Sequence, residues 1–442
     1  MEGDMEEVDV DVGDEGLLER VGAIDVAKAS AKVCVRIPGK SRRITRVWDV
    51  AAATNAIMAL ADELVELRIE RVVLEATSDY WRPYFYLLEA RGLCVWLVNA
   101  RDVKNVPGRP KTDKLDAIWL AKLNERGMLR PSFVPPKEIR ELRDYTRLRA
   151  ELVEERSRYK NRLEKLLEDA LIKLSTVATD IFGKSGRAML EALIEGERDP
   201  EVLTELALGK LRKKTVALRE ALTGRFDAHH AELARMLLDQ VDALSEKIDR
   251  ITARVNELVE QLPGNERSVD PETGEIAPGP PSAIDRLDEV PGIGSRAAQV
   301  IIAEIGLDMA QFPTPAHLVS WAKLAPRTIQ SGLRSKSGRT GKGNPYLKSV
   351  MGEVASAAAR TDTFLGERYR RLARRRGRQR ALVAIARSIL VIVWFLLNDP
   401  EAHFVDLGSD FYEHRIDKDR RTRDLVRQLA ALGHQVTLSP AA

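Results

Sequence analysis

Cysteine, histidine and aromatic residues are scarce in this chain. Its 442 residues include two cysteines and six histidines, and aromatic residues make up 5%. Cys34 and Cys94 lie in separate apolar runs and neither has a Cys-x-x-Cys partner, so the sequence predicts neither a disulfide framework nor a zinc site. The adjacent His229 and His230 have no further ligand-type neighbours in sequence, which favours a surface pair over a metal site.

A long uninterrupted apolar run is also missing. The most apolar stretch, from Ala381 to Leu397, is interrupted by Arg387 and is too short to span a bilayer. No signal peptide opens the sequence. Together with the few cysteines, this predicts a cytoplasmic protein without a membrane partner.

Acidic and basic residues nearly balance over the whole chain, but they are unevenly distributed. The first 16 residues hold eight acids and no base, and removing those acids from the formal net charge of +3 leaves +11 on the rest of the chain. We interpret residues 1–19 as a disordered acidic leader. Two basic clusters follow, Arg334, Lys336, Arg339, Lys342 and Lys348, and Arg368, Arg370, Arg371, Arg374, Arg375, Arg376, Arg378 and Arg380. Such clusters are often solvated faces, but this density of arginine favours phosphate binding.

The hydrophobic pattern of the first folded part is typical of an α/β domain. Two or three strands are predicted between residues 20 and 48, followed by a helix from Ala51 to Ile69, a buried strand at Arg71 to Glu75, a helix from Tyr80 to Arg91 and a strand from Leu93 to Val98. This succession predicts a mixed sheet covered by helices.

Four acids stand at informative places in that layout. Asp25 interrupts an apolar strand and Glu75 ends another, where a buried carboxylate is costly unless it is paired or bound to metal. Asp113 and Asp116 are three residues apart in the first turn of a predicted helix with Thr112 as its N-cap, so they share one face. Each acid alone could simply cap a helix or end a turn, but together they can bind a hard cation.

The middle of the chain is predicted to be helical. Apolar residues recur at spacings of four and three from Leu237 to Leu262, which is the pattern of a coiled-coil seam. This seam predicts either a subunit interface or a helical hairpin with the helix that begins near Glu138. No chemistry can be assigned to residues 175–230.

A Pro- and Gly-rich linker precedes a second folded part. Gly292 and Gly294 lie in a segment typical of a helix-hairpin-helix, where glycine lets backbone N–H groups approach a phosphate. Downstream, Ser331 and Gly332 follow Leu324-Ala325-Pro326 and precede closely spaced bases.

These features together resemble the transposases of the insertion-sequence 110 family. Asp25 in AIDVAK, Glu75 in VVLEAT and the acids of KTDKLDA match the DEDD tetrad of its RuvC-like, RNase H-type domain, and the segment around Ser331 resembles its C-terminal domain. The resemblance implies that Asp25, Glu75, Asp113 and Asp116 bind Mg²⁺ or Mn²⁺ and that Ser331 is the nucleophile. It covers Arg20 to about Leu397.

The resemblance implies a RuvC-like N-terminal domain, a long helical middle and a mainly α C-terminal domain. The expected segments are a leader (1–19), a DEDD domain (20–132), a helical and coiled-coil region (133–262), a linker (263–282), a transposase domain (283–400) and a tail (401–442). The basic residues expected to contact nucleic acid, beside Gly292 and Gly294, are Arg334, Lys336, Arg339, Lys342, Arg374, Arg375 and Arg376.

The expected activity is cutting and rejoining of donor and target DNA through a phosphoserine link. Family membership further implies guidance by a structured bridge RNA. The regular seam predicts self-assembly into a dimer or tetramer through the coiled coil. The expected location is the bacterial cytoplasm, on the nucleoid when the protein is bound to DNA. Two alternatives stay open: a RuvC-like junction endonuclease that activates water and needs no serine, and a non-catalytic DNA-binding scaffold.

Overall fold

The computed structural model describes residues 18–40, 43–75, 78–99, 113–263, 281–326, 328–332, 334–338, 340–414 and 418–439. The chain forms two compact units, Met1–Val134 and Pro135–Ala442. The acidic leader, Thr112, Arg339 and most of the expected linker lie outside the described residues. The side chains of Asp113, Ser331 and Lys336 also lie outside the description, although their backbones are included.

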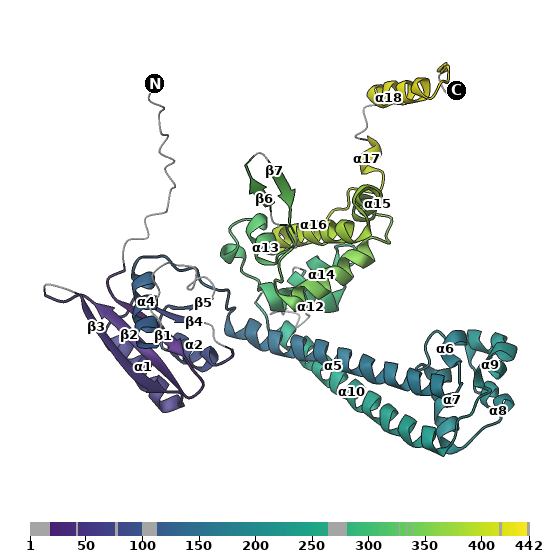
Figure 1. Ribbon diagram of the computed structural model, residues 1–442, viewed down its shortest axis with the longest axis horizontal. Coiled ribbons are helices and arrows are strands. Elements are labelled where there is room, and N and C mark those ends of the chain that lie inside the picture. The colour runs from purple at the N-terminus through teal and green to yellow at the C-terminus, as the bar shows by residue number, and fades with distance from the viewer. Residues whose placement is uncertain are drawn as a thin grey trace, which may run out of the picture. The chain divides into compact units, whose positions relative to one another are not determined.

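The first unit is built on a five-stranded mixed sheet (Figure 1). Its strands are β1 (Val21–Val26), β2 (Ser30–Ile37), β3 (Ile44–Ala51), β4 (Arg71–Glu75) and β5 (Val95–Val98). They lie in the order β3-β2-β1-β4-β5, with β2 antiparallel to β1 and β3, and with β4 parallel to both β1 and β5. The predicted α/β succession with a mixed sheet is confirmed.

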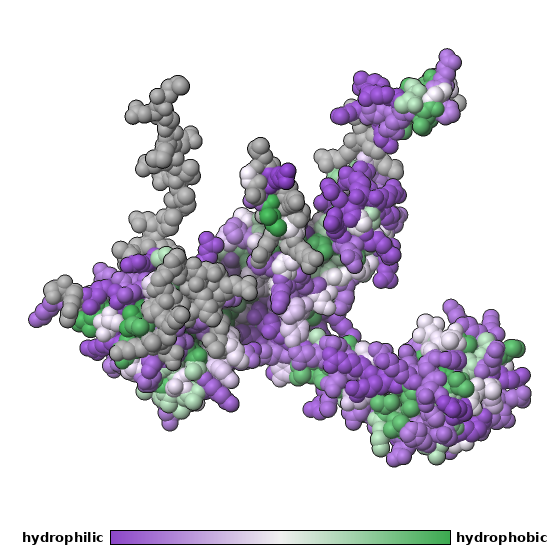
Figure 2. All heavy atoms as spheres, viewed as in Figure 1, coloured by the Kyte–Doolittle hydropathy of each residue, from purple (hydrophilic) through white to green (hydrophobic). Residues whose placement is uncertain are grey.

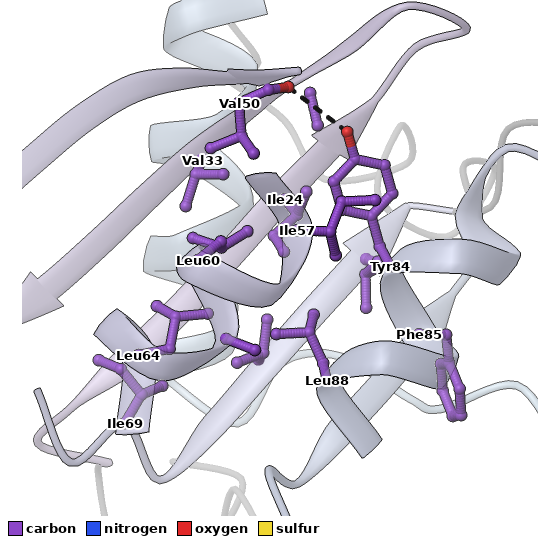
Figure 3. Packing of buried hydrophobic residues seen from close by; sticks show 14 of the residues in the cluster. Ile24, Val33, Val50, Ile57, Leu60, Leu64, Ile69, Tyr84, Phe85 and Leu88 are labelled. Atoms are coloured by element: carbon purple, nitrogen blue, oxygen red, sulfur yellow. Dashed lines mark hydrogen bonds between the residues drawn. The ribbon is translucent and has the colours of Figure 1, made fainter. Parts of the chain in front are cut away.

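One face of the sheet packs against two helices, α1 (Thr54–Glu66) and α2 (Trp81–Ala90). Apolar residues at helical spacing on α1, such as Ile57, Leu60 and Leu64, meet the alternate residues of the strands (Figure 3). The hydroxyl of the buried Tyr84 donates a hydrogen bond to the carbonyl oxygen of Val50 at 3.4 Å, and burial raises the pKa of this tyrosine. This face is therefore a closed apolar layer.

The opposite face packs against α4 (Asp113–Glu125). The strand residues that alternate with those of the first layer, including Ala23, Cys34 and Val73, contact Ala117 and Leu120 of this helix. Both cysteines are free, and burial raises the pKa of the Cys34 thiol to about 12.

A pair of long antiparallel helices dominates the second unit. α5 (Lys137–Asp169) and α10 (Ala228–Glu260) lie side by side (Figure 1). The imidazole of His230 meets Asp169, and the Arg156 guanidinium donates to the Ser245 hydroxyl at 3.2 Å. The seam residues Val241, Leu244, Ile248, Val255 and Leu258 are buried within the chain. The hairpin interpretation is therefore the one that the structure adopts, and this seam is not available to a second copy.

We call the helical hairpin of α5 and α10 the arm. Its far end carries a small helical cluster. Its elements are α6 (Leu174–Val177), α7 (Lys184–Glu195), α8 (Pro200–Glu205), the 3₁₀-helix η1 (Gly209–Lys214) and α9 (Thr215–Leu222). Their apolar residues form one core with the adjoining ends of α5 and α10. His230 is buried at 5% exposure, so its interpretation as a surface residue was wrong.

The remaining helices form the C-terminal part of the second unit. They are α11 (Ala283–Asp288), α12 (Ser295–Ile305), the 3₁₀-helix η2 (Met309–Gln311), α13 (Pro315–Trp321), α14 (Pro345–Ala358), α15 (Phe364–Arg376), α16 (Arg378–Asn398), α17 (Phe411–His414) and α18 (Lys418–Ala431). A hairpin of β6 (Thr328–Ser331) and β7 (Arg334–Ser337) lies between α13 and α14. The prediction that the most apolar stretch is too short to span a bilayer was wrong: within the described residues, α16 alone is long and apolar enough by length and composition to cross a membrane. Half of its most apolar 18-residue window is buried inside the protein.

Candidate functional site

Two of the predicted acids lie side by side at one edge of the sheet. β1 and β4 pair in parallel, and their last paired residues immediately precede Asp25 and Glu75. Side chains alternate along a strand, and Ala23 and Val73, two residues earlier, pack on the α4 face. Asp25 and Glu75 therefore belong to the α4 face as well. Glu75 is buried at 8% exposure, whereas Asp25 is half-buried.

A buried asparagine fixes the direction of α4. The Asn124 side-chain amide donates to the carbonyl oxygens of Gly22 and Arg71, both at 3.1 Å, and its oxygen accepts from the Arg71 guanidinium at 2.8 Å. Gly22 and Arg71 lie at the starts of β1 and β4, while Asn124 lies in the last turn of α4. The helix therefore runs antiparallel to both strands, and its first turn lies toward their carboxyl ends.

Helix and strand rise then bring the second acid pair to the same level. From Asn124 back to Asp116 the helix spans about 12 Å, and from Gly22 to Asp25 the strand spans about 10 Å. Asp116 is half-buried, and Asp113 begins the helix one turn further on. Asp25, Glu75 and Asp116 thus lie on elements whose ends approach the same sheet edge, while the Asp113 side chain lies outside the described residues.

The donors gathered at this edge suit a hard divalent cation. Carboxylate oxygens are the ligands that Mg²⁺ and Mn²⁺ prefer, and no sulfur or nitrogen ligand was predicted here. Among the side chains that the structure describes, no three of His, Cys, Asp or Glu lie close enough to hold a metal ion. Asp25, Glu75 and Asp116, whose side chains are described, therefore do not by themselves form a metal-binding cluster.

Two residues near the tetrad were missed by the sequence analysis. Lys32 is the cross-strand neighbour of Asp25 and forms an ion pair with Asp49 at 2.6 Å. Asn124 has no exposure at all, yet it makes the hydrogen bonds that hold α4. An asparagine among apolar residues late in a helix was the available signal, because a buried amide needs partners.

The predicted nucleophile lies on the β-hairpin of the second unit. Ser331 ends β6 and is paired across the two-residue turn with Arg334, the first residue of β7. Gly332 in this turn has φ of 57°, a left-handed conformation that favours glycine. Arg334 is exposed, so a base flanks the serine position on the hairpin.

A buried glutamate connects α5 to the C-terminal helices of the second unit. Glu304 of α12 is completely buried and accepts two hydrogen bonds from Arg147 of α5, both at 2.8 Å. Burial lowers the pKa of Arg147, but the hydrogen bonds and charge of Glu304 outweigh this and raise it. The Asn344 amide, at the N-cap of α14, also donates to Glu304. One carboxylate thus joins α5, α12 and the start of α14.

Comparisons with known proteins give the family. Residues 22–172 match a family model described as Transposase, of the DEDD type of IS110, and residues 284–370 match a model of the Transposase IS116/IS110/IS902 family. The chain belongs to the IS110 family of transposases.

Two relatives of this transposase match over most of their length. One is described as the insertion element IS110 uncharacterized 43.6 kDa protein of Streptomyces coelicolor, 26% identical over 86% of this chain and 89% of the relative. The other is the transposase for insertion sequence element IS1111A of Coxiella burnetii, 23% identical over 87% and 91%. A solved T. thermophilus RuvC in complex with a Holliday junction substrate matches 26% of this chain and 99% of its own, at 14% identity and a TM-score of 0.21.

The two glycines of the transposase's predicted helix-hairpin-helix have different surroundings. Gly292 has φ of 94°, and a Cβ atom there would lie 2.5 Å from the Val354 carbonyl oxygen, so close packing on α14 already requires glycine. Gly294 is exposed at the start of α12 and has no such neighbour. Gly294 therefore remains the better candidate for a phosphate contact.

The arginine cluster of the transposase divides into two groups. Arg368 donates to the Tyr412 hydroxyl, Arg370 pairs with Glu367, and Arg371 lies over the Tyr412 ring. These three bases have partners within the protein. By contrast, Arg374, Arg375 and Arg376 in the last turn of α15 are exposed, and none forms an ion pair with a described residue. They remain candidates for nucleic-acid contacts, together with the exposed Lys342.

Proposed function

We propose that this transposase cuts and rejoins DNA at a divalent-metal site formed by Asp25, Glu75, Asp113 and Asp116. The observation that supports it most is the approach of β1, β4 and the first turn of α4 to one sheet edge. A metal bound there supplies a Lewis acid for phosphoryl transfer. Mg²⁺ is the expected cation, with Mn²⁺ as its substitute.

The same proposal makes Ser331 the nucleophile. Its hydroxyl oxygen forms a bond to phosphorus while a backbone phosphorus–oxygen bond of DNA breaks, and the leaving deoxyribose oxygen takes up a proton. The phosphoserine link conserves the energy of the broken bond, so a hydroxyl of a second strand can displace serine and rejoin the DNA. The exposed Arg334 across the turn supports this role because its charge favours a nearby phosphate.

The proposed partners are donor and target DNA, a structured bridge RNA and further copies of this chain in a dimer or tetramer. Nucleic-acid binding is supported by the exposed bases of the hairpin and of α15. The bridge RNA follows from the family resemblance. Because the α10 seam is covered within the chain, a subunit interface is expected on other surfaces.

The decisive experiment compares the same substitution, aspartate to asparagine, at two positions: one in the predicted site and one outside it. Asp116→Asn removes a predicted ligand charge at nearly constant shape, so DNA cleavage in Mg²⁺ should fall at least about a hundredfold. Asp62→Asn removes an exposed carboxylate from α1, on the opposite face of the sheet, and should leave cleavage unchanged. Mn²⁺ binding, measured by calorimetry without DNA, should weaken in Asp116→Asn alone.

Two outcomes would contradict this proposal. Full cleavage by the wild type in excess chelator would show that cleavage does not require a metal. Equal Mn²⁺ affinity in the wild type and in Asp116→Asn would place the cation elsewhere. Metal-dependent cleavage that never forms a protein–DNA link would instead support an endonuclease that uses the same acids to activate water.

A further inference from the structure

A concentrated basic surface lies at the far end of the arm, in the small helical cluster of the second unit. The 3₁₀-helix η1 has the sequence GKLRKK, and residues 206–219 contain five bases and no acid. We call Lys210, Arg212, Lys213 and Lys214 the tip patch. All four side chains are exposed.

The tip patch differs from the other bases of its cluster in how it is balanced. Arg187 of α7 pairs with Asp242 at 2.6 Å, and Arg219 of α9 pairs with Glu201 at 3.4 Å. Among the described residues, no ion pair joins a member of the patch to another residue, in contrast to Arg187 and Arg219. Lys214 donates one hydrogen bond, at 2.9 Å, to the carbonyl oxygen of Val177.

Local electrostatics do not favour this arrangement. Three of the bases are consecutive, and α9 begins at the next residue with no acid in its first turn. Cations before a helix N-terminus are opposed by the helix dipole, and they repel one another. The patch therefore lowers stability slightly unless an external anion offsets its charge.

The chemistry of the surface favours phosphate over a protein partner. Leu208 and Val216 flank the patch at 55% and 80% exposure, but two separate apolar side chains are too few for a docking surface. Four exposed cations, none in an ion pair with a described residue, match the repeated charges of a nucleic-acid backbone.

The length of the arm places the patch far from the C-terminal helices of the same unit. α5 contacts α12 through Arg147 and enters the core of the arm end at Leu163. The helix rises about 24 Å between these two residues, which equals about seven base pairs at 3.4 Å each. The arm end is visible in Figure 1 beyond the paired α5 and α10, and Figure 2 shows the arm covered largely by hydrophilic residues.

We propose that the tip patch binds the phosphate backbone of a nucleic-acid duplex and so extends the footprint of the protein beyond the site of cleavage. The binding is independent of sequence, because lysine and arginine contacts to phosphate position a duplex without reading its bases. The inference shares with the proposed function only the premise that nucleic acid is bound. It needs no metal and no serine.

The test measures binding of the full chain to labelled 40-base-pair DNA and RNA duplexes in chelator, so that failure of the catalytic proposal cannot affect it. The tip variant carries Lys210→Gln, Arg212→Gln and Lys213→Gln. The matched control carries Lys165→Gln, Lys247→Gln and Arg250→Gln, three exposed bases on the two arm helices. Both variants lose three charges from the same arm.

The tip variant should bind at least one duplex about tenfold more weakly near 0.1 M salt, while the control stays within about twofold of the wild type. Its slope of log affinity against log salt should flatten by about two, because each lost phosphate contact removes about 0.9. A loss confined to DNA or to RNA identifies which backbone is bound. Wild-type affinity and slope on both duplexes, or an equal loss in the control, would overturn the proposal.

Folding is checked by thermal denaturation, and the tip variant should melt no lower than the wild type because its side chains are exposed and mutually repulsive. Should the triple variant fold poorly, the single change Lys213→Glu gives the same test. It must lower duplex affinity more than Lys247→Glu does, or the patch does not contact phosphate.

Discussion

Asn124 shows how one buried side chain can set the geometry of a site that it does not enter. Its amide joins the starts of β1 and β4 to the last turn of α4, while the acids lie at the other end of the same three elements. The Arg71 guanidinium donates a hydrogen bond to the Asn124 side-chain oxygen. The same guanidinium lies over the Trp96 ring, 3.8 Å from its centroid. A shift of α4 along its axis would therefore move Asp116 relative to Asp25.

Asn124→Asp should weaken Mn²⁺ binding and lower the melting temperature. The substitution keeps the acceptor for Arg71 but removes two donors and leaves two buried carbonyl groups unpaired, at a cost of about 3 kcal/mol. Leu60→Ala, on the opposite face of the sheet, should cost a similar free energy of unfolding without moving α4. If both variants bind Mn²⁺ equally well, Asn124 contributes only stability.

Ser331 carries the chemical distinction between a recombinase and an endonuclease. Ser331→Ala removes the hydroxyl and keeps a residue compatible with a strand, so binding of DNA and RNA should remain within about twofold of the wild type. The covalent protein–DNA species on a denaturing gel should disappear, because it requires the serine oxygen.

Two neighbouring serines provide the control for that experiment. Ser335 and Ser337 lie on β7, the strand paired with β6, and their alanine variants should still form the covalent species. If Ser335→Ala loses the covalent species and Ser331→Ala keeps it, the nucleophile is Ser335 on β7 and not Ser331.

Among the elements, the arm has its own stabilising contact, where α10 begins beside the end of α5. The imidazole of His230 lies 2.6 Å from the carboxylate of Asp227, which is the N-cap residue of α10. It also lies 3.2 Å from the Asp169 carboxylate. Burial lowers the pKa of His230, but these two acids outweigh burial and raise it above 6.5. The backbone and side chain of His230 in turn lower the pKa of Asp227 below 3.8.

These shifts predict that the arm is most stable in mildly acidic solution. A raised histidine pKa adds stability that is complete below about pH 6.5 and is lost as pH rises through the folded-state value. A lowered aspartate pKa adds stability that is lost only as pH falls below about 4. Melting curves should therefore show His230→Gln losing more stability, relative to the wild type, at pH 5.5 than at pH 8.5. A difference that does not depend on pH would mean that His230 acts by packing alone.

For the whole molecule, the sequence predicted most of the elements because their signals are local. Strand alternation predicted the sheet, which the structure has. The acids at the strand ends predicted a site, which is a proposal. The sequence left open whether the α10 seam packs on α5, which it does in the structure. An apolar stripe on a helix is the same whether the helix that it packs against belongs to the same chain or to another. Nor was Asn124 identified, because only the fold brings it to the carbonyl groups of Gly22 and Arg71.

Charge over the whole molecule gives the last prediction. The net charge of +3 includes the eight acids of the leader, so the remaining chain can bind phosphate strongly while the protein stays near neutrality. Replacing Arg374, Arg375 and Arg376 by glutamine removes three exposed bases from the end of α15. The slope of log affinity against log salt for duplex DNA should then flatten by about two to three.

The Lys165, Lys247 and Arg250 triple variant serves as the comparison, because it lowers the net charge equally from surfaces where acids alternate with bases. If the α15 variant and this control flatten the slope to the same small extent, the arginines contribute only to the overall field. If the α15 variant alone flattens it, each lost unit of slope counts about one phosphate contact, and the end of α15 belongs to the nucleic-acid interface.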